Sequence, residues 1–207
     1  LFLEEVIQQF KNLGYKNIWW KIVCAADYGV PQMRYRMFMI GNRLGVDFEA
    51  PPKTNFPIGS GKFPEYTTVG DAIMDLVGKE NHVANHVPLN HKPIVAARYK
   101  YVKEGCKLNL DDLPPELAIA TRRDSKTGKI VNYSHVYKRL DRNSPSTTMV
   151  PGHNAFPIHP TLNRTLTARE AARIQTFPDS HIFFGTRQEQ CIQVGNAVPP
   201  KMAEPFF

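Results

Sequence analysis

The side chains most suited to contact an anion follow the Gly29–Pro31 turn. Gln32, Arg34 and Arg36 alternate along a short extended segment, and alternate residues of such a segment face the same way. We therefore expect the three side chains to project together. Two adjacent guanidiniums repel each other unless an anion or buried acceptors compensate them. The segment predicts an anion-contacting site or, on these residues alone, a cluster of surface ion pairs.

A second group of charged residues lies on a predicted helix from Thr167 to Gln175. Thr167 and Glu170 have the spacing of a capping box, in which each side chain bonds the other residue's backbone N–H. Arg169 and Arg173 are four residues apart and share one face, and Glu170 is placed to pair with Arg173. This arrangement favours a structural role, in which the arginines brace a junction between domains.

The third group is the segment Gln193 to Pro200. Gly195 permits a close backbone approach, and the amide of Asn196 can donate and accept hydrogen bonds at once. The prolines that follow suit the first position of another helix. By itself the segment is compatible with any tight turn before a helix.

Helices and strands alternate around these groups, which predicts an α/β fold. The expected elements are an amphipathic helix over 1–13 ending at Gly14, a buried strand over 17–24, a strand over 37–40, a proline-rich linker over 45–66, and a helix over 68–76 capped by Thr68 and Asp71. Residues 81–135 are expected to be irregular, with His82, His86 and His91 as exposed loop residues.

Composition narrows the class of protein. The 207 residues carry a net charge of +7, and residues 92–142 hold 12 basic against 6 acidic side chains, which favours a polyanionic partner or a solvated basic face. The three cysteines are far apart, with no CxxC or HExxH spacing, so we expect no metal site and a reducing compartment. No apolar run reaches membrane-spanning length, and the N-terminus does not resemble a signal peptide.

Taken together and in this order, the three groups resemble motifs VIII, IX and X of the cytosine-5 DNA methyltransferases. Residues 139–148 also resemble the threonine step late in that family's target-recognition region. The resemblance covers nearly the whole chain. It implies the C-terminal portion of a Rossmann-like, S-adenosylmethionine-dependent methyltransferase domain, with a small and mostly irregular target-recognition domain. The implied division is 1–44 for the catalytic α/β part, 45–160 for target recognition, and 161–207 for the return to the catalytic domain.

The resemblance also implies a role for each group. Arg36 would reach a flipped-out cytosine or its phosphate, Arg34 would brace the catalytic loop, and Gln32 would orient both. The residues implied at S-adenosylmethionine are Gly195, Asn196 and Ala197. Those implied at double-stranded DNA are Arg122, Arg123, Arg139 and Thr148, and those implied to be structural are Arg169, Glu170 and Arg173.

The family's nucleophile is absent from the chain. No cysteine follows a proline, no glycine-rich cofactor turn is present, and Glu80 begins a Glu-Asn-His-Val segment on the wrong side of motif VIII. We therefore expect the chain to be inactive alone and to need a missing N-terminal catalytic portion, whether as a truncation or as one polypeptide of a split enzyme.

Other functions remain compatible with the sequence. They are a DNA-binding polypeptide without catalysis, a tRNA-methylating relative, which would typically show a Cys-Phe-Thr step that this chain lacks, and a basic α/β fragment without a ligand. The compact recognition region favours a bacterial restriction-modification enzyme located in the cytoplasm.

Overall fold

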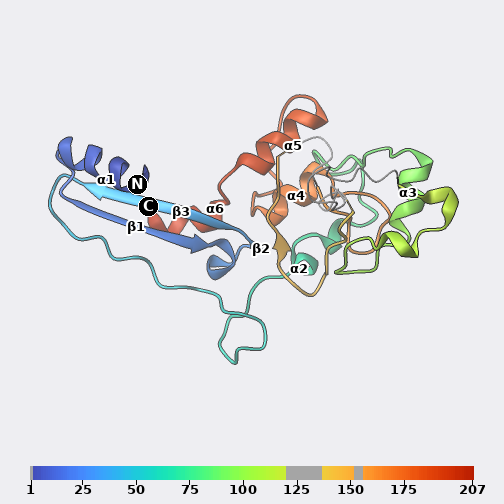
Figure 1. Ribbon diagram of the computed structural model, residues 1–207, viewed down its shortest axis with the longest axis horizontal. Coiled ribbons are helices and arrows are strands. Elements are labelled where there is room, and N and C mark those ends of the chain that lie inside the picture. Colours follow the sequence, from blue (N-terminus) through green and yellow to red (C-terminus); the bar gives the residue numbers. More distant parts are fainter. Residues whose placement is uncertain (1, 120–136, 152–155) are drawn as a thin grey trace, which may run out of the picture.

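The computed structural model describes residues 2–119, 137–151 and 156–207, which form two lobes joined by a narrower region (Figure 1). The first lobe holds α1 (Phe2–Asn12), β1 (Asn17–Cys24), η1 (Ala25–Tyr28), β3 (Tyr35–Asn42), α6 (Pro200–Ala203) and η5 (Glu204–Phe206). The second holds α2 (Val69–Ile73), η2 (Met74–Leu76), α3 (Pro93–Tyr99), η3 (Leu110–Asp112), η4 (Pro115–Leu117), α4 (Ala168–Ile174) and α5 (Arg187–Asn196). Between them β2 (Gln32–Met33) pairs with β4 (Ser146–Thr147).

The first lobe is built on an antiparallel hairpin of β1 and β3, in which Ile22 lies opposite Met37. The predicted helix and both predicted strands are present, and β3 is longer than expected. One face of the hairpin packs against the C-terminal end of the chain, where the rings of Phe38 and Phe206 are 4.5 Å apart. The C-terminal end of the chain therefore returns to the hairpin of this lobe (Figure 1).

The prediction that β1 is a buried strand is wrong for most of its length. On the face turned away from Phe206, Ile22 is 69% exposed and Met37 is 53% exposed, and Trp20 and Tyr35 are exposed beside them. Only the end of β1, from Val23, is buried. Among the described residues no third strand joins this sheet, and no other element buries these four side chains.

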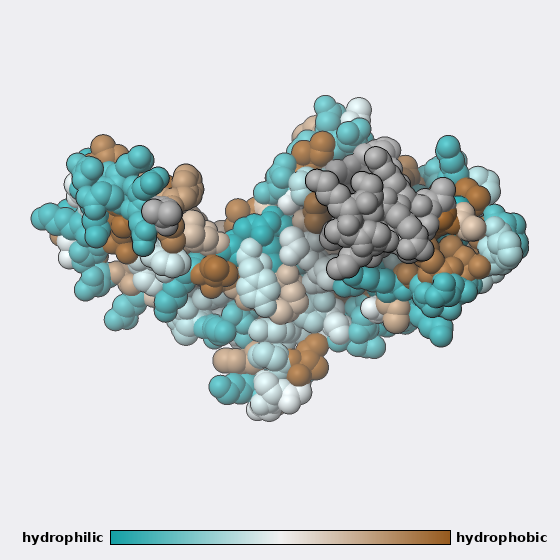
Figure 2. Space-filling model, in the orientation of Figure 1, coloured by the Kyte–Doolittle hydropathy of each residue, from teal (hydrophilic) through white to brown (hydrophobic). Residues whose placement is uncertain are grey.

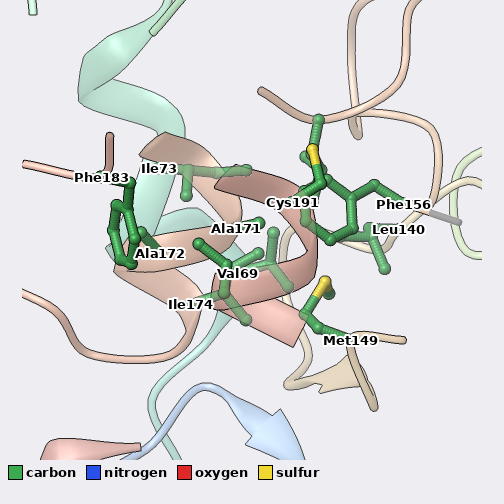
Figure 3. Close-up of a cluster of buried hydrophobic side chains, with 12 residues drawn as sticks. Val69, Ile73, Leu140, Met149, Phe156, Ala171, Ala172, Ile174, Phe183 and Cys191 are labelled. Atoms are coloured by element: carbon green, nitrogen blue, oxygen red, sulfur yellow. The ribbon is translucent and has the colours of Figure 1, made fainter. Parts of the chain in front are cut away.

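A second core lies where α2, α4 and α5 meet (Figure 3). Ala171 and Ala172 of α4 present small side chains that let Ile73 of α2 and Cys191 of α5 pack closely. Both predicted capping boxes are confirmed, at the starts of α2 and α4. Each cap depends only on two residues three positions apart, so the local sequence is enough to predict it.

Two helices were missed by the sequence patterns. α3 lies in the stretch expected to be irregular and begins with Pro93, whose fixed φ suits a first helical position. α5 includes Gly195 and Asn196, which we expected in a turn, and it begins with a third capping box formed by Thr186 and Glu189. The turn itself begins one residue later, at Ala197.

The linker is anchored to the first lobe by Asp27. This buried carboxylate accepts a hydrogen bond from Tyr66 Oη and forms an ion pair with Lys53 at 2.8 Å, while the Asp27 carbonyl accepts the N–H groups of Thr54 and Asn55. Residues 45–66 contain no helix or strand, as predicted, apart from one isolated bridge. The loop is therefore held to the first lobe at two places, near residues 53–55 and at Tyr66.

The prediction that His86 is an exposed loop residue is also wrong. It is fully buried, and its ring nitrogens contact Thr167 Oγ1 at 2.8 Å and the Leu76 carbonyl at 3.0 Å. His91 is half-buried against Thr165. Both rings link the loop before α3 to the segment that leads into α4. They are structural, and only His82 is exposed as expected.

Candidate active-site scaffold

Gln32 lies at the centre of the contact between the lobes. The side chain is fully buried. Its amide oxygen accepts the N–H of Met149 at 2.9 Å, and its amide nitrogen donates to Gln175 Oε1 at 3.0 Å. Gln175 in turn donates to the Val194 carbonyl in α5. One glutamine therefore ties β2 to the segment after β4 and to the C-terminal cap of α4.

Arg34 is buried, with 2% of its surface exposed, and its guanidinium donates to three backbone carbonyls. They belong to Met149 at 3.1 Å, Gly195 at 3.1 Å and Ala197 at 3.0 Å. Burial, and then the nearby charge of Arg36, lower the pKa of Arg34 to about 10. The side chain thus joins β2 and β3 to two segments, at Met149 and at Gly195–Ala197, that each lie more than a hundred residues further along the chain.

Arg36 has a different environment. It is half-exposed, and its guanidinium donates to its neighbour's carbonyl, Tyr35 O, at 2.7 Å. The expected common projection is therefore wrong, because Gln32 lies in β2 and pairs with β4, whereas Arg36 lies in β3 and pairs with β1. The surface ion-pair interpretation is also wrong, since neither arginine contacts a carboxylate among the described residues. Arg36 keeps exposed donors for a ligand, whereas the unpartnered Nε of Arg34 is buried.

The segment around Asn196, at the end of α5, contacts the Arg34 guanidinium through the carbonyls on either side. A Cβ at Gly195 would lie 2.5 Å from the backbone of Pro151, so the absence of a side chain there is required by protein packing. The Ala197 carbonyl is occupied by Arg34. Asn196 is exposed, and its amide has no hydrogen-bond partner in the described part of the chain. Of the three predicted cofactor contacts, only Asn196 has a side chain free to make one.

The residues predicted to bind DNA differ in their exposure and in the partners of their side chains. Thr148 is half-buried, and its hydroxyl donates to the Met33 carbonyl at 3.0 Å. Arg139 is 5% exposed, and its guanidinium is enclosed by oxygen acceptors from Tyr99, Val102, His159, Pro160, Leu162 and Asn163. This placement contradicts a DNA contact by Arg139, whose donors are used inside the protein. Arg122 and Arg123 lie outside the described residues.

The arginines of α4 are structural. Arg169 donates to the carbonyls of Ala84, Pro178 and His181. Arg173 joins α4 to both Asp75 and Asp179. The expected pair between Glu170 and Arg173 is wrong.

Glu170 is instead bound through both oxygens by Arg164, at 2.8 Å each. Burial alone would raise the pKa of Glu170, but these bonds outweigh it and hold the pKa below its usual range. Arg164 precedes the helix, so the i,i+3 and i,i+4 rules for helix surfaces did not identify it.

His159 is a buried group that the sequence did not single out. Its Nδ1 accepts the N–H groups of Thr161 and Leu162, so Nε2 carries the proton of the neutral ring. Nε2 lies 3.7 Å from Glu170 Oε1 and makes no hydrogen bond. Burial lowers the pKa of His159 to about 4, although Glu170 acts in the opposite direction. A second proton would have to displace the two N–H groups from Nδ1.

We expect acid to destabilise the fold through this ring. Unfolded histidine binds a proton near pH 6.5, whereas His159 in the fold does so near pH 4, so stability falls as the pH drops between these values. The free energy of unfolding, measured in urea, should fall by about 2 kcal/mol from pH 7 to pH 5. His91, with a pKa also lowered by burial, adds to the fall.

Two variants test the assignment. His159→Asn keeps an acceptor near the Nδ1 position and removes the titrating ring, so its pH dependence should be flatter. His82→Asn, at an exposed position, should keep the full dependence. An equal pH dependence in His159→Asn and the unmodified chain would contradict the assignment.

The described residues contain no cluster of side chains suited to hold a metal ion and no helix long and apolar enough to cross a membrane.

Comparison with known proteins identifies the family. Residues 2–207 match the C-5 cytosine-specific DNA methylases. The chain belongs to this family. The structure brings the Gln32–Arg36 segment together with the C-terminal cap of α4 through Gln32, and with the end of α5 through Arg34.

The chain is also similar to individual type II methyltransferases. The chain is 35% identical over 204 residues to the type II methyltransferase M1.HphI of Haemophilus parahaemolyticus, covering 97% of this chain and 49% of that protein. It is 33% identical to M.NgoFVII of Neisseria gonorrhoeae, of which it covers 50%. The chain thus spans about half the length of these relatives.

Two further comparisons concern length and fold. M.AquIB of Picosynechococcus is 37% identical over 138 residues, and there the match covers 86% of the relative. A solved structure of a putative DNA modification methyltransferase encoded within an E. coli prophage superposes with a TM-score of 0.65 over 97% of this chain at 24% identity. The fold is therefore shared with a DNA methyltransferase.

Proposed function

We propose that this chain is the C-terminal portion of a DNA (cytosine-5)-methyltransferase that transfers a methyl group from S-adenosylmethionine to C5 of a flipped-out cytosine. The single observation that carries this proposal is the buried Arg34 guanidinium, which ties the Gln32–Arg36 segment to the end of α5. The two segments that the resemblance assigns to substrate and cofactor are thereby held side by side. Family membership and the type II methyltransferase relatives support the same activity.

Arg36 is the residue we assign to the substrate. Attack on C6 of the cytosine places negative charge on the ring and its oxygen, and a preorganised cation at that point stabilises the transition state. Arg36 lies two residues from the buried Arg34, on a strand held by eight paired positions, so its backbone is rigid while its guanidinium remains open. Arg34 and Gln32 position this strand and do not touch the substrate.

Asn196 is the residue we assign to the cofactor. Its unpartnered amide, at the end of α5, can donate to a carboxylate and accept from an ammonium group, which are the polar groups at the amino-acid end of S-adenosylmethionine. When bound, the cofactor supplies the methyl group. Gly195 and Ala197 act on the protein side of this site, through close packing on Pro151 and the hydrogen bond from Arg34.

The exposed apolar face of the β1–β3 hairpin supports the need for a partner. A strand whose side chains are apolar on both faces is expected to be covered on both. Here Phe206 covers one face and leaves Trp20, Ile22 and Met37 exposed on the other. We infer that the N-terminal catalytic portion, which brings the nucleophilic cysteine, covers this second face. M.AquIB, matched over most of its length, supports a separate polypeptide as one way to provide this half.

The remaining assignments follow from this proposal. Residues 1–44 and 161–207 belong to the catalytic domain, and residues 45–160 form the target-recognition region for double-stranded DNA. Thr148, Arg122 and Arg123 remain candidate DNA contacts. The bacterial type II relatives support a restriction-modification enzyme of the bacterial cytoplasm, inactive in the absence of its N-terminal portion.

The test is Arg36→Ala in the enzyme reconstituted with the N-terminal catalytic portion. Methyl transfer to duplex DNA should fall by about 10²–10³-fold, the cost of removing one charge-stabilising donor. Thermal unfolding should be nearly unchanged, because the side chain is half-exposed and bonds only its neighbour's carbonyl. The readout is incorporation of labelled methyl groups.

Arg43→Ala is the matched control, since this arginine is exposed near the end of the same strand and stacks only on the Tyr15 ring. It should leave methylation unchanged. Full activity in Arg36→Ala would remove Arg36 from the active site. DNA binding by the reconstituted enzyme without any methylation would favour the non-catalytic alternative.

A further inference from the structure

Two lysines lie directly opposite each other in the second lobe. Lys107 and Lys138 form an antiparallel bridge, flanked by the hydrogen bonds Leu108 N to Tyr137 O at 2.8 Å and Arg139 N to Cys106 O at 3.0 Å. Directly opposed side chains of such a pair stand close together on one face, and like charges there are destabilising. The backbone thus holds two cations side by side.

Neither charge is neutralised. In the ranges the structure describes, no carboxylate forms an ion pair with Lys107 or Lys138, although several other basic residues in this lobe have such partners. Burial, and then the charge of Lys107, lower the pKa of Lys138. The guanidinium of Arg139, next in sequence, is enclosed by carbonyl and amide oxygens inside the lobe and does not join this pair. Two cations therefore lie together.

A pocket of about 190 Å³ opens beside Lys138. That is several times the ~30 Å³ that a water molecule occupies in the liquid, so a phosphate group fits. Its polar lining residues are Lys138, Arg139, Asp141, Ser144 and Thr147, and Lys107 lies opposite Lys138 at its edge. Both oxygens of Asp141 accept hydrogen bonds within the local turn, from Asn143 N and Ser144 Oγ. The two opposed lysines outnumber this carboxylate, so the edge of the pocket at Lys138 is positive.

The pocket is connected to the proposed active site by a short rigid path. Thr147 lines the pocket and lies in β4, where it pairs with Met33 of β2, three residues before Arg36. Figure 1 shows β2 and β4 between the two lobes, and Figure 2 shows the molecule hollowed between the lobes on the side where α5 leads to α6. A backbone group held in the pocket would therefore be fixed relative to the proposed cytosine site.

We propose that the pocket beside Lys138, together with Lys107 opposite that lysine, binds a backbone phosphodiester of the DNA substrate and so sets the position of the duplex relative to Arg36. The inference rests on the proposed function and adds a specific positioning site to it. Phosphate contacts fix the register of a protein on DNA without reading its sequence. The pocket accordingly contributes to affinity for every duplex alike.

The test uses Lys107→Gln, Lys138→Gln and the double variant in the reconstituted enzyme, with duplex DNA titrated over a salt series. Each lost phosphate contact should reduce the slope of log K against log salt by about 0.9. Affinity should fall by the same factor for substrate and unrelated duplexes. Lys11→Gln, an exposed lysine on α1 in the other lobe, should keep the original slope.

The outcomes are separable from those of the proposed function. An unmodified enzyme that fails to bind duplex DNA would overturn both. Normal binding with an unchanged slope in a folded double variant, checked by circular dichroism, would overturn the phosphate site alone. A loss confined to one DNA sequence would mean base recognition instead. Inorganic phosphate that binds the pocket without competing with DNA would assign the site to a free anion and also overturn the proposal.

Discussion

Arg34→Ala should lower the free energy of unfolding by about 4 kcal/mol, whereas Arg36→Ala, two residues away, should change it by less than about 0.5 kcal/mol. The buried guanidinium of Arg34 donates to three carbonyls, and its removal leaves the oxygens of Met149, Gly195 and Ala197 without their donor. An unsatisfied buried acceptor costs about 1–3 kcal/mol. Urea unfolding followed by circular dichroism measures both variants.

Arg34→Lys distinguishes geometry from charge. A lysine keeps the positive charge but lacks the planar fork of donors that reaches three carbonyls on two segments, so it should recover little of the lost stability. Normal stability in Arg34→Ala, with methylation lost, would contradict this account and move Arg34 from the scaffold to the substrate. Normal stability in Arg34→Lys would mean that its charge alone matters.

Arg139→Met should be at least as damaging, by about 4–5 kcal/mol. The methionine keeps an unbranched apolar stem but removes every donor from a cage whose acceptors include the carbonyls of Tyr99, Val102, His159 and Leu162. Domain stabilities are typically about 5–15 kcal/mol, so a loss of this size removes a large fraction of the stability and should lower the unfolding temperature of the second lobe. Limited proteolysis and circular dichroism measure it.

Arg142→Met is the control for this prediction. Arg142 is three residues further along and pairs through two donors with the Glu104 carboxylate at the surface, where solvent screens the interaction. We expect little change in its unfolding curve. A stable Arg139→Met chain with reduced DNA affinity would restore Arg139 as a DNA contact.

The elements that could be predicted are those determined by neighbouring residues. The caps at Thr68 and Thr167 depend on a partner three positions away, and both formed. The strands predicted over 17–24 and 37–40 are both present, and the second extends over Tyr35–Asn42. The helix α5 was missed because its capping box lies before a polar stretch with little apolar periodicity.

Burial of charged residues could not be predicted in the same way. A basic stretch suggests an exposed face, and Arg139 was accordingly assigned to DNA. Its acceptors come from segments 20–40 residues away, and only the folded chain assembles them into a cage. The same holds for His86, whose partners Leu76 and Thr167 lie on either side of the second core.

The sequence by itself determined the family, because the order and spacing of three short motifs are read from the sequence and do not depend on how the chain folds. The tertiary structure decided which residue of each motif is structural and which is open to a ligand. Arg34 and Arg36 have the same chemistry and nearly the same position in sequence. They differ because Arg34 meets carbonyls from residues 149, 195 and 197, a coincidence in space between segments that no local pattern encodes.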